Sequence, residues 1–154
     1  MKIKRKSIVF HNLLSMTQVC PPDEWYHIAL ALREVIIAKG LYINAPIIYK
    51  YIKVDKKQNE YTVFVPVNAE IVVASDMPFS FVKELHIEDA LVFRLADLEA
   101  PGEDEAYLLL EACAESQGCK LEHPFYNICL NVFDEIMLDI VAPIVMLDDT
   151  PGEI

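Results

Sequence analysis

Apolar residues recur at helical spacing in two stretches of the chain, residues 23–40 and 102–118. Both stretches begin with acidic residues and end at a glycine, Gly40 or Gly118, as is typical of helix N-termini and of the C′ position. The pattern therefore predicts two amphipathic helices. Their apolar faces hold Trp25, Ile28, Ala29, Leu32, Val35 and Ile36 in the first helix, and Ala106, Leu109, Leu110 and Cys113 in the second.

Segments rich in β-branched and aromatic residues surround both helices and predict strands. They cover residues 6–19, 46–54 and 61–67 in the first half of the chain, and residues 83–97, 124–132 and 138–144 in the second. A proline stands six residues after each helix-ending glycine, at Pro46 and Pro124. These prolines lie 78 positions apart, and Pro66 and Pro143 in the later strands lie 77 apart. We predict one domain, 1–154, in which a strand–helix–strand–strand unit occurs twice, at about 3–73 and 83–147.

Charge is divided unevenly along the chain, whose net charge is −11. Up to Val82 there are ten Lys and Arg residues against seven Asp and Glu, whereas from Lys83 onward there are three against seventeen. The acidic half should repel nucleic-acid phosphates and attract a basic protein. Simple solvation of a charged face explains the same pattern, so both interpretations stay open.

Composition favours a cytoplasmic protein without membrane contact. No run of about 18 apolar residues is present, and the basic N-terminus lacks a signal-peptide core. The four cysteines form no C-x-x-C pair, which is typical of reduced, buried thiols.

Enzyme and cofactor motifs are absent from the sequence. There is no G-x-S-x-G, H-E-x-x-H, P-loop or G-x-G-x-x-G motif. His86 and Glu88 share one strand face, but two ligands make a weak metal signal and a solvated pair is the simpler interpretation. We predict no cofactor and no metal, and an enzymatic role is not favoured.

The doubled pattern resembles the GyrI-like family, which includes BmrR-type effector-binding domains. The resemblance rests on the glycine after each helix, the G-x5-P spacing into the next strand, and the proline in the final strand segment DIVAPI, and it spans residues 7–144. It implies an α+β fold in which the duplicated βαββ unit forms a curved antiparallel sheet with two helices on one face. A ligand groove would lie on the pseudo-twofold axis.

Strand alternation selects the candidate groove residues. It places Ile48, Ile52, Tyr126, Ile128, Leu130 and Val132 beneath the helices, and the intervening side chains on the opposite face. The candidates on that face are Tyr49, Tyr51, Asn127, Cys129 and Asn131. They either bind a ligand or cover the open sheet. Drug-binding relatives carry a glutamate and an aromatic residue where this chain has Asn127 and Cys129. The resemblance therefore does not predict selectivity for multidrug cations, although the aromatic faces of Tyr49 and Tyr51 could still attract a cation.

Two functions follow as hypotheses. The first is a stand-alone, non-enzymatic module that binds a small hydrophobic or aromatic ligand. The alternative is an acidic protein–protein module, such as an immunity or inhibitor protein for a basic partner. Nucleic acid and membrane are not expected as partners, and free sheet edges can pair to give a homodimer.

Overall fold

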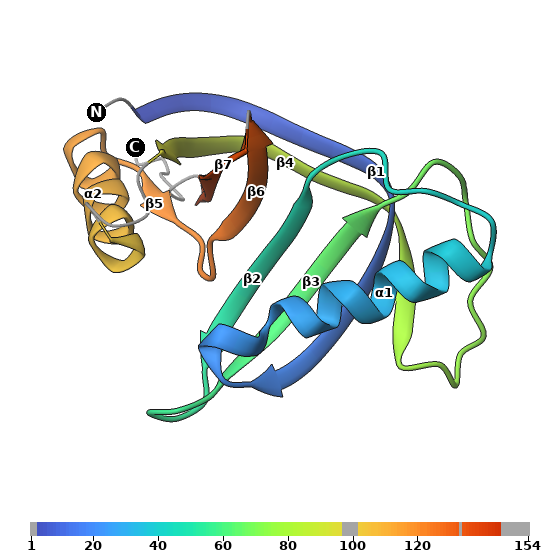
Figure 1. Ribbon diagram of the computed structural model, residues 1–154. Helices are drawn as coiled ribbons and strands as arrows, with labels where there is room; N and C mark the ends of the chain where they lie inside the picture. The colour runs from blue at the N-terminus through green and yellow to red at the C-terminus, as the bar shows by residue number, and fades with distance from the viewer. Residues whose placement is uncertain (1–2, 97–101, 133, 146–154) are drawn as a thin grey trace.

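The chain folds into antiparallel strands and two α-helices, as a computed structural model shows for residues 3–96, 102–132 and 134–145 (Figure 1). The elements in order are β1 (Ile3–Cys20), the 3-10 turn η1 (Pro22–Glu24), α1 (Tyr26–Ala38), β2 (Ile47–Lys53), β3 (Asn59–Pro66), β4 (Phe79–Leu95), α2 (Glu103–Ser116), β5 (Lys120–Leu121), β6 (Tyr126–Val132) and β7 (Glu135–Val145). Both predicted helices and all predicted strands are present, and β5 is an additional short strand.

The strands form a barrel-like sheet. Their order is β4-β1-β3-β2-β6-β7-β5, and a further pairing between β4 and β7 joins the sheet to itself. In that pairing residues 90–95 of β4 lie opposite residues 138–143 of β7. The sequence predicted a curved antiparallel sheet. The sheet is curved so strongly that β4 and β7 pair and close it.

Both halves of the chain arrange their strands in the same order. The last strand of each half lies between two longer strands of that half, giving β1-β3-β2 and β4-β7-β6, and the short β5 also pairs with β7. The halves meet along the β1–β4 ladder and again where β2 pairs with β6. In the β2–β6 pairing Tyr49 lies opposite Asn127, a residue 78 positions further along the chain. This is the offset that separates Pro46 and Pro124. The order is the one that a repeated unit would produce, and the duplication itself stays a prediction.

Both helices end in the same hydrogen-bonded cap. At the end of α1 the Leu41 N–H donates to the Ile36 carbonyl at 3.0 Å, and Gly40 has a φ of 76°. At the end of α2 the Cys119 N–H donates to Ala114 at 2.9 Å. Gly118 there has a φ of 72°. A residue with a side chain is strained at such angles, which explains the glycine at each predicted helix end.

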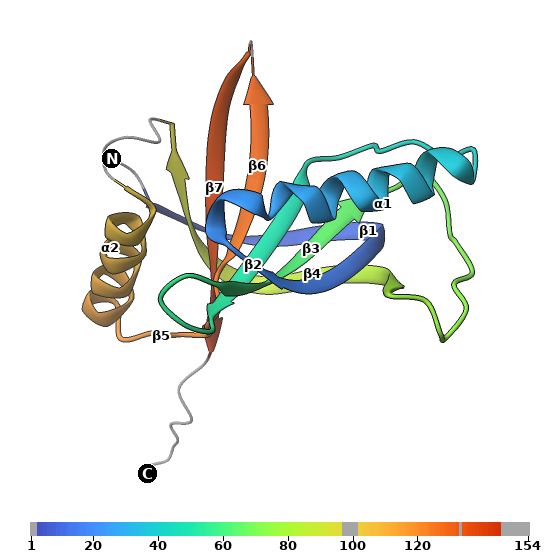
Figure 2. The same ribbon diagram turned by 60° about the horizontal axis from the view of Figure 1, so that its bottom comes forward.

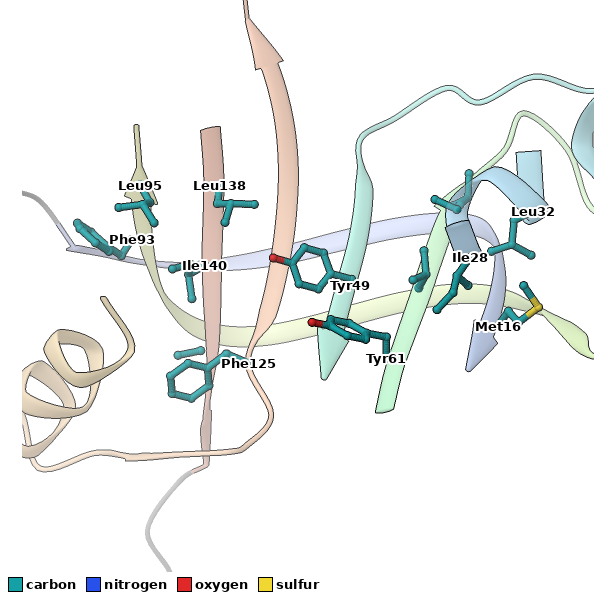
Figure 3. Close-up of a cluster of buried hydrophobic side chains, with 14 of the residues drawn as sticks. Met16, Ile28, Leu32, Tyr49, Tyr61, Phe93, Leu95, Phe125, Leu138 and Ile140 are labelled. Carbon is teal, nitrogen blue, oxygen red and sulfur yellow. The ribbon is translucent and has the colours of Figure 1, made fainter. Parts of the chain in front are cut away.

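The two helices cover one face of the sheet. Buried side chains of α1 and α2 belong to a single apolar cluster that includes Leu14, Val63, Leu91 and Ile140 from the strands. Figure 2 shows α1 lying across β1 to β3 and α2 lying beside the second half of the sheet, and Figure 3 shows side chains of this cluster. The helix residues buried here are Ile28, Ala29, Leu32, Ile36, Ala106, Leu110 and Ala114. Neither described helix has the length and apolarity needed to cross a lipid bilayer.

A second apolar cluster lies on the other face of the sheet. Its buried members come from strands alone, namely Leu13, Ile48, Phe64, Ile87, Ala90, Val92, Ile128 and Val141. Ile48 is 1% exposed although no helix packs on it. The curvature of the sheet therefore buries this face against itself, and the central strands are apolar on both sides.

We expect Leu32→Ala to lower the free energy of unfolding by about 2–5 kcal/mol, because the side chain is 0% exposed and its truncation leaves a cavity beneath α1. Leu30→Ala on the same helix is the matched control, since Leu30 is 44% exposed. Urea denaturation followed by circular dichroism measures both values. Equal losses in the two variants would contradict the packing of α1 described here.

Candidate ligand-binding groove

A groove of about 710 Å³ opens between the start of α1, strands β2 and β3, and the start of α2. Alternation along β2 directs Tyr49, Tyr51 and Lys53 to the same side of the strand. Tyr49 pairs with Val63, Tyr51 with Tyr61, and Lys53 with Asn59. The groove is lined by Pro22, Trp25, Tyr49, Tyr51, Lys53, Val54, Asp55, Lys56, Asn59, Tyr61, Glu103 and Asp104.

Aromatic rings form the inner wall of the groove. The Trp25 and Tyr49 ring centroids lie 4.3 Å apart, and those of Tyr51 and Tyr61 lie 5.4 Å apart. Tyr107 from α2 extends the cluster at 6.4 Å from Tyr51. In Figure 3 the Tyr49 and Tyr61 hydroxyls point in the same direction, away from α1. Ring faces of this kind bind flat apolar groups and cations.

Glu103 brings a carboxylate to this aromatic wall. It is the first residue of α2, and its Oε1 accepts a hydrogen bond of 3.1 Å from the Tyr49 hydroxyl. Burial raises the pKa of the Glu103 carboxyl above its usual range, and the charge of Asp104 adds to this, while the Tyr49 hydrogen bond opposes it. The N-terminal end of the helix dipole favours a negative charge at this position. The ionised Glu103 carboxylate is therefore only partly solvated by water.

The tyrosines around Glu103 stay protonated at physiological pH. Burial raises the pKa of Tyr51 to about 12, with the Glu103 and Asp104 charges adding to the effect. Burial also raises the pKa of Tyr49, Tyr61 and Tyr107 above the usual phenol range. The phenols are therefore neutral hydrogen-bond donors rather than phenolates.

Asn127 fixes the floor beneath the groove. The side chain is fully buried, its Oδ1 accepts from the Tyr107 hydroxyl at 2.9 Å, and its Nδ2 donates to the Tyr49 carbonyl at 3.3 Å. Cys129 lies two residues after Asn127 on the same side of β6, opposite Ile47. Burial raises the pKa of its thiol to about 12. Both residues support the aromatic wall, and neither is among the side chains that line the groove.

The structure brings together four of the five candidate residues. Tyr49 and Tyr51 line the groove, Asn127 forms hydrogen bonds with Tyr49 and Tyr107, and Cys129 lies two residues along β6 on the same side of the strand. Asn131 is exposed in the β6–β7 hairpin. The hairpin extends beyond the helices in Figure 2. Their role in ligand binding stays a prediction.

The predicted sheet face of these residues was wrong. Tyr49 belongs to the cluster beneath the helices, whereas Ile48 and Ile128 belong to the opposite cluster, against which Tyr126 packs. Ile52 is 55% exposed. Because both faces of β2 are apolar near Ile48, alternation could not tell the helix side from the other side. The groove accordingly lies between the helices rather than on the face away from them.

Of the twelve residues that line the groove, only Tyr49 and Tyr51 were predicted from the sequence, and the most important of the others are Trp25, Tyr61 and Glu103. Trp25 was assigned to the core, and Tyr61 was only part of a predicted strand. Glu103 belonged to the acidic start of a helix, which is an ordinary feature of helix N-termini. Its contact with Tyr49 joins residues 54 positions apart, so only the tertiary structure reveals it.

Residues 9–148 match the family described as Domain of unknown function (DUF5085), and the chain belongs to this family. No curated protein matches the chain. Several solved structures share the fold at low sequence identity.

The EcmrR C-terminal domain superposes with a TM-score of 0.71 at 16% identity, covering 95% of this chain and 98% of that domain. The longer EcmrR chain in a DNA complex gives the same TM-score at 17% identity, and the match spans 58% of it. A hydrolase from Listeria innocua superposes with a TM-score of 0.64 at 10% identity, covering 94% of this chain and 92% of the other. SAV2435 bound to tetraphenylphosphonium gives 0.54 at 12% identity, with 96% of each chain covered. The architecture is consistent with the GyrI-like fold that the sequence resembles.

Glu103→Gln should raise the free energy of unfolding relative to the wild type, and this difference should grow as pH rises. The folded chain holds a proton at Glu103 more tightly than the unfolded chain, so the free energy of unfolding falls as pH rises through the raised pKa. Glutamine still accepts the Tyr49 hydrogen bond and carries no charge to desolvate.

Urea denaturation between pH 4 and pH 8 tests this expectation. The gain of Glu103→Gln over the wild type should grow across that interval, whereas the exposed control Glu105→Gln should follow the wild-type curve. A constant difference for Glu103→Gln at every pH would show that the carboxylate is not under-solvated.

Proposed function

We propose that the groove binds a small aromatic molecule carrying a positive charge or a strong hydrogen-bond donor. The observation that carries the proposal is the Glu103 carboxylate, part-buried and hydrogen-bonded to Tyr49 within an aromatic wall. A carboxylate removed from water is costly unless an opposite charge pairs with it. A ligand cation would supply that charge, and the rings of Trp25, Tyr49 and Tyr51 would add about 0.5–2 kcal/mol through cation–π contact.

Glu103 also changes the expectation drawn from Asn127. Because Asn127 stands where drug-binding relatives carry a glutamate, the resemblance alone does not predict cation selectivity. In this chain α2 would deliver the carboxylate to the groove instead of β6, while Asn127 holds Tyr107 in place. The solved structure of SAV2435 with tetraphenylphosphonium supports the choice of an aromatic cation as first ligand.

We further propose that binding, rather than catalysis, is the activity of this domain. The tyrosines and Cys129 have raised pKa values through burial, which disfavours their anionic, nucleophilic forms. The alternative, an acidic module for a basic protein partner, stays a prediction drawn from net charge. Cytoplasmic localisation, the lack of a nucleic-acid partner and a homodimer also stay predictions from the sequence.

Tetraphenylphosphonium is expected to bind the wild-type protein and to bind Glu103→Gln about tenfold or more weakly. A charge pair at 4 Å near a protein surface contributes up to about 4 kcal/mol, and tenfold corresponds to about 1.4 kcal/mol. Trp25 is the only tryptophan of the chain and lines the groove, so quenching of its fluorescence reports binding directly.

The control is Glu105→Gln, which removes a charge from an exposed position two residues along the same helix. It should leave the affinity within about twofold, since exposed charges are screened. Equal weakening by both substitutions would point to a general effect of net charge and would contradict the proposed site.

Affinity for tetraphenylphosphonium should fall as pH is lowered through the raised pKa of Glu103. The ligand has no titratable group, so the pH dependence belongs to the protein. Protonation removes the negative charge that the ligand pairs with, and binding in turn lowers the Glu103 pKa. Calorimetric titrations from pH 8 to pH 5 measure the trend. Glu103→Gln should give a flat profile, and a parallel decline in that variant would assign the titration to another group.

A further inference from the structure

The groove has acidic side chains near Tyr49 and basic side chains near the end of β2. Lys53 lies two residues beyond Tyr51 on the same side of the strand, and it pairs with Asn59 of β3. Lys56 follows in the turn between the two strands. Both lysines line the groove and both are exposed, so they form its outer rim.

Strand geometry separates this rim from the carboxylate. Glu103 bonds to Tyr49, which lies four residues before Lys53. At about 3.3 Å per residue, the two levels of the groove are about 13 Å apart along the strand. The aromatic rings of Tyr51 and Tyr61 lie between them. The groove therefore has an acidic inner end, an aromatic middle and a basic rim.

The other acidic groups of the groove reduce the positive charge of the rim without cancelling it, because Asp55 contributes one negative charge against two lysines. Asp55 stands between the lysines in sequence, but its Oδ1 accepts hydrogen bonds of 2.8 Å from the Lys57 and Gln58 backbone N–H groups and shapes the turn. Asp104 lies beside Glu103 at the acidic end. Among the residues that the structure describes, neither Lys53 nor Lys56 has a carboxylate within 4.0 Å.

We propose that the groove recognises an aromatic zwitterion, whose cationic group binds at Glu103 and whose carboxylate, sulfonate or phosphate binds at Lys53 and Lys56. This inference rests on the proposed function and adds the second charge. A ligand with a positive charge alone satisfies Glu103 but leaves the rim unpaired, so it is an incomplete match. Exposed ion pairs are weak, and the rim is expected to add a preference of several-fold rather than the bulk of the affinity.

A matched pair of dyes tests the rim. Rhodamine 110 and rhodamine 123 share one xanthylium cation and differ in a single group, which is a free carboxylate in the first and its methyl ester in the second. At pH 7.5 and low salt, fluorescence anisotropy should show rhodamine 110 binding about 3- to 10-fold more tightly to the wild-type protein. Because the rim is exposed, the preference should shrink at 0.5 M salt.

Substitutions then assign the preference to its source. The double variant Lys53→Met with Lys56→Met should lose the preference by weakening rhodamine 110 while leaving rhodamine 123 unchanged or slightly tighter. Lys57→Met is the control, because Lys57 lies in the same turn but outside the groove lining. All the exchanged side chains are exposed, and circular dichroism verifies that each variant is folded.

The outcomes separate the two proposals. Equal affinity for both dyes, with both weakened by Glu103→Gln, would overturn the zwitterion inference and leave the proposed function standing. A preference that survives the double variant, or that disappears equally in Lys57→Met, would also overturn it. If neither dye binds, or if Glu103→Gln leaves both affinities unchanged, the proposed function itself is wrong.

Discussion

The groove depends on a short seam in which β2 and β6 pair through three residues on each strand. At the end of this seam the fully buried Asn127 donates to the Tyr49 carbonyl and accepts from the Tyr107 hydroxyl. A buried amide left without partners would cost about 1–3 kcal/mol, so both bonds are strongly favoured. They tie a strand of the first half to the helix of the second half. Since Glu103 precedes Tyr107 by four residues, on the same side of α2, the seam also holds the carboxylate over Tyr49.

The proposed role of Glu103 would place ligand binding and folding stability in opposition. Burial partly removes its negative charge from water and raises its pKa, which disfavours the folded state at neutral pH relative to a neutral side chain. The Tyr49 hydrogen bond and the helix N-terminus offset part of this cost. A ligand cation would relieve the remainder, so part of the binding energy comes from a penalty already present in the unliganded protein. Such unfavourable local arrangements are typical of binding sites.

The sequence was sufficient to predict the helices and strands, but not which face of β2 and β6 lies beneath the helices. Both helices and their C-terminal glycines could be predicted, because apolar spacing and the positive φ of Gly40 and Gly118 are local properties. The strands could be predicted because their richness in β-branched and aromatic residues is also a local property. The orientation of β2 failed because Ile48 and Tyr49 are both buried, one on each face, and a strand that is apolar on both sides gives no phase. Glu103 was missed because its partner comes from another half of the chain, and no local pattern encodes that contact.

The structure also gives the uneven charge of the chain a local meaning. Lys53 and Lys56 belong to the first half, which carries the positive excess, whereas Glu103 and Asp104 belong to the strongly acidic second half. Taken along the sequence, this division favours a basic protein partner. In the fold, the β2–β6 seam is one of two places where the halves meet, and beside it their opposite charges face the same groove from its two ends. A uniform negative potential would favour any cation that reaches the surface. Charges of opposite sign at the two ends of the groove would instead favour the proposed zwitterionic ligand, because a ligand that satisfies only one end leaves the other end unpaired.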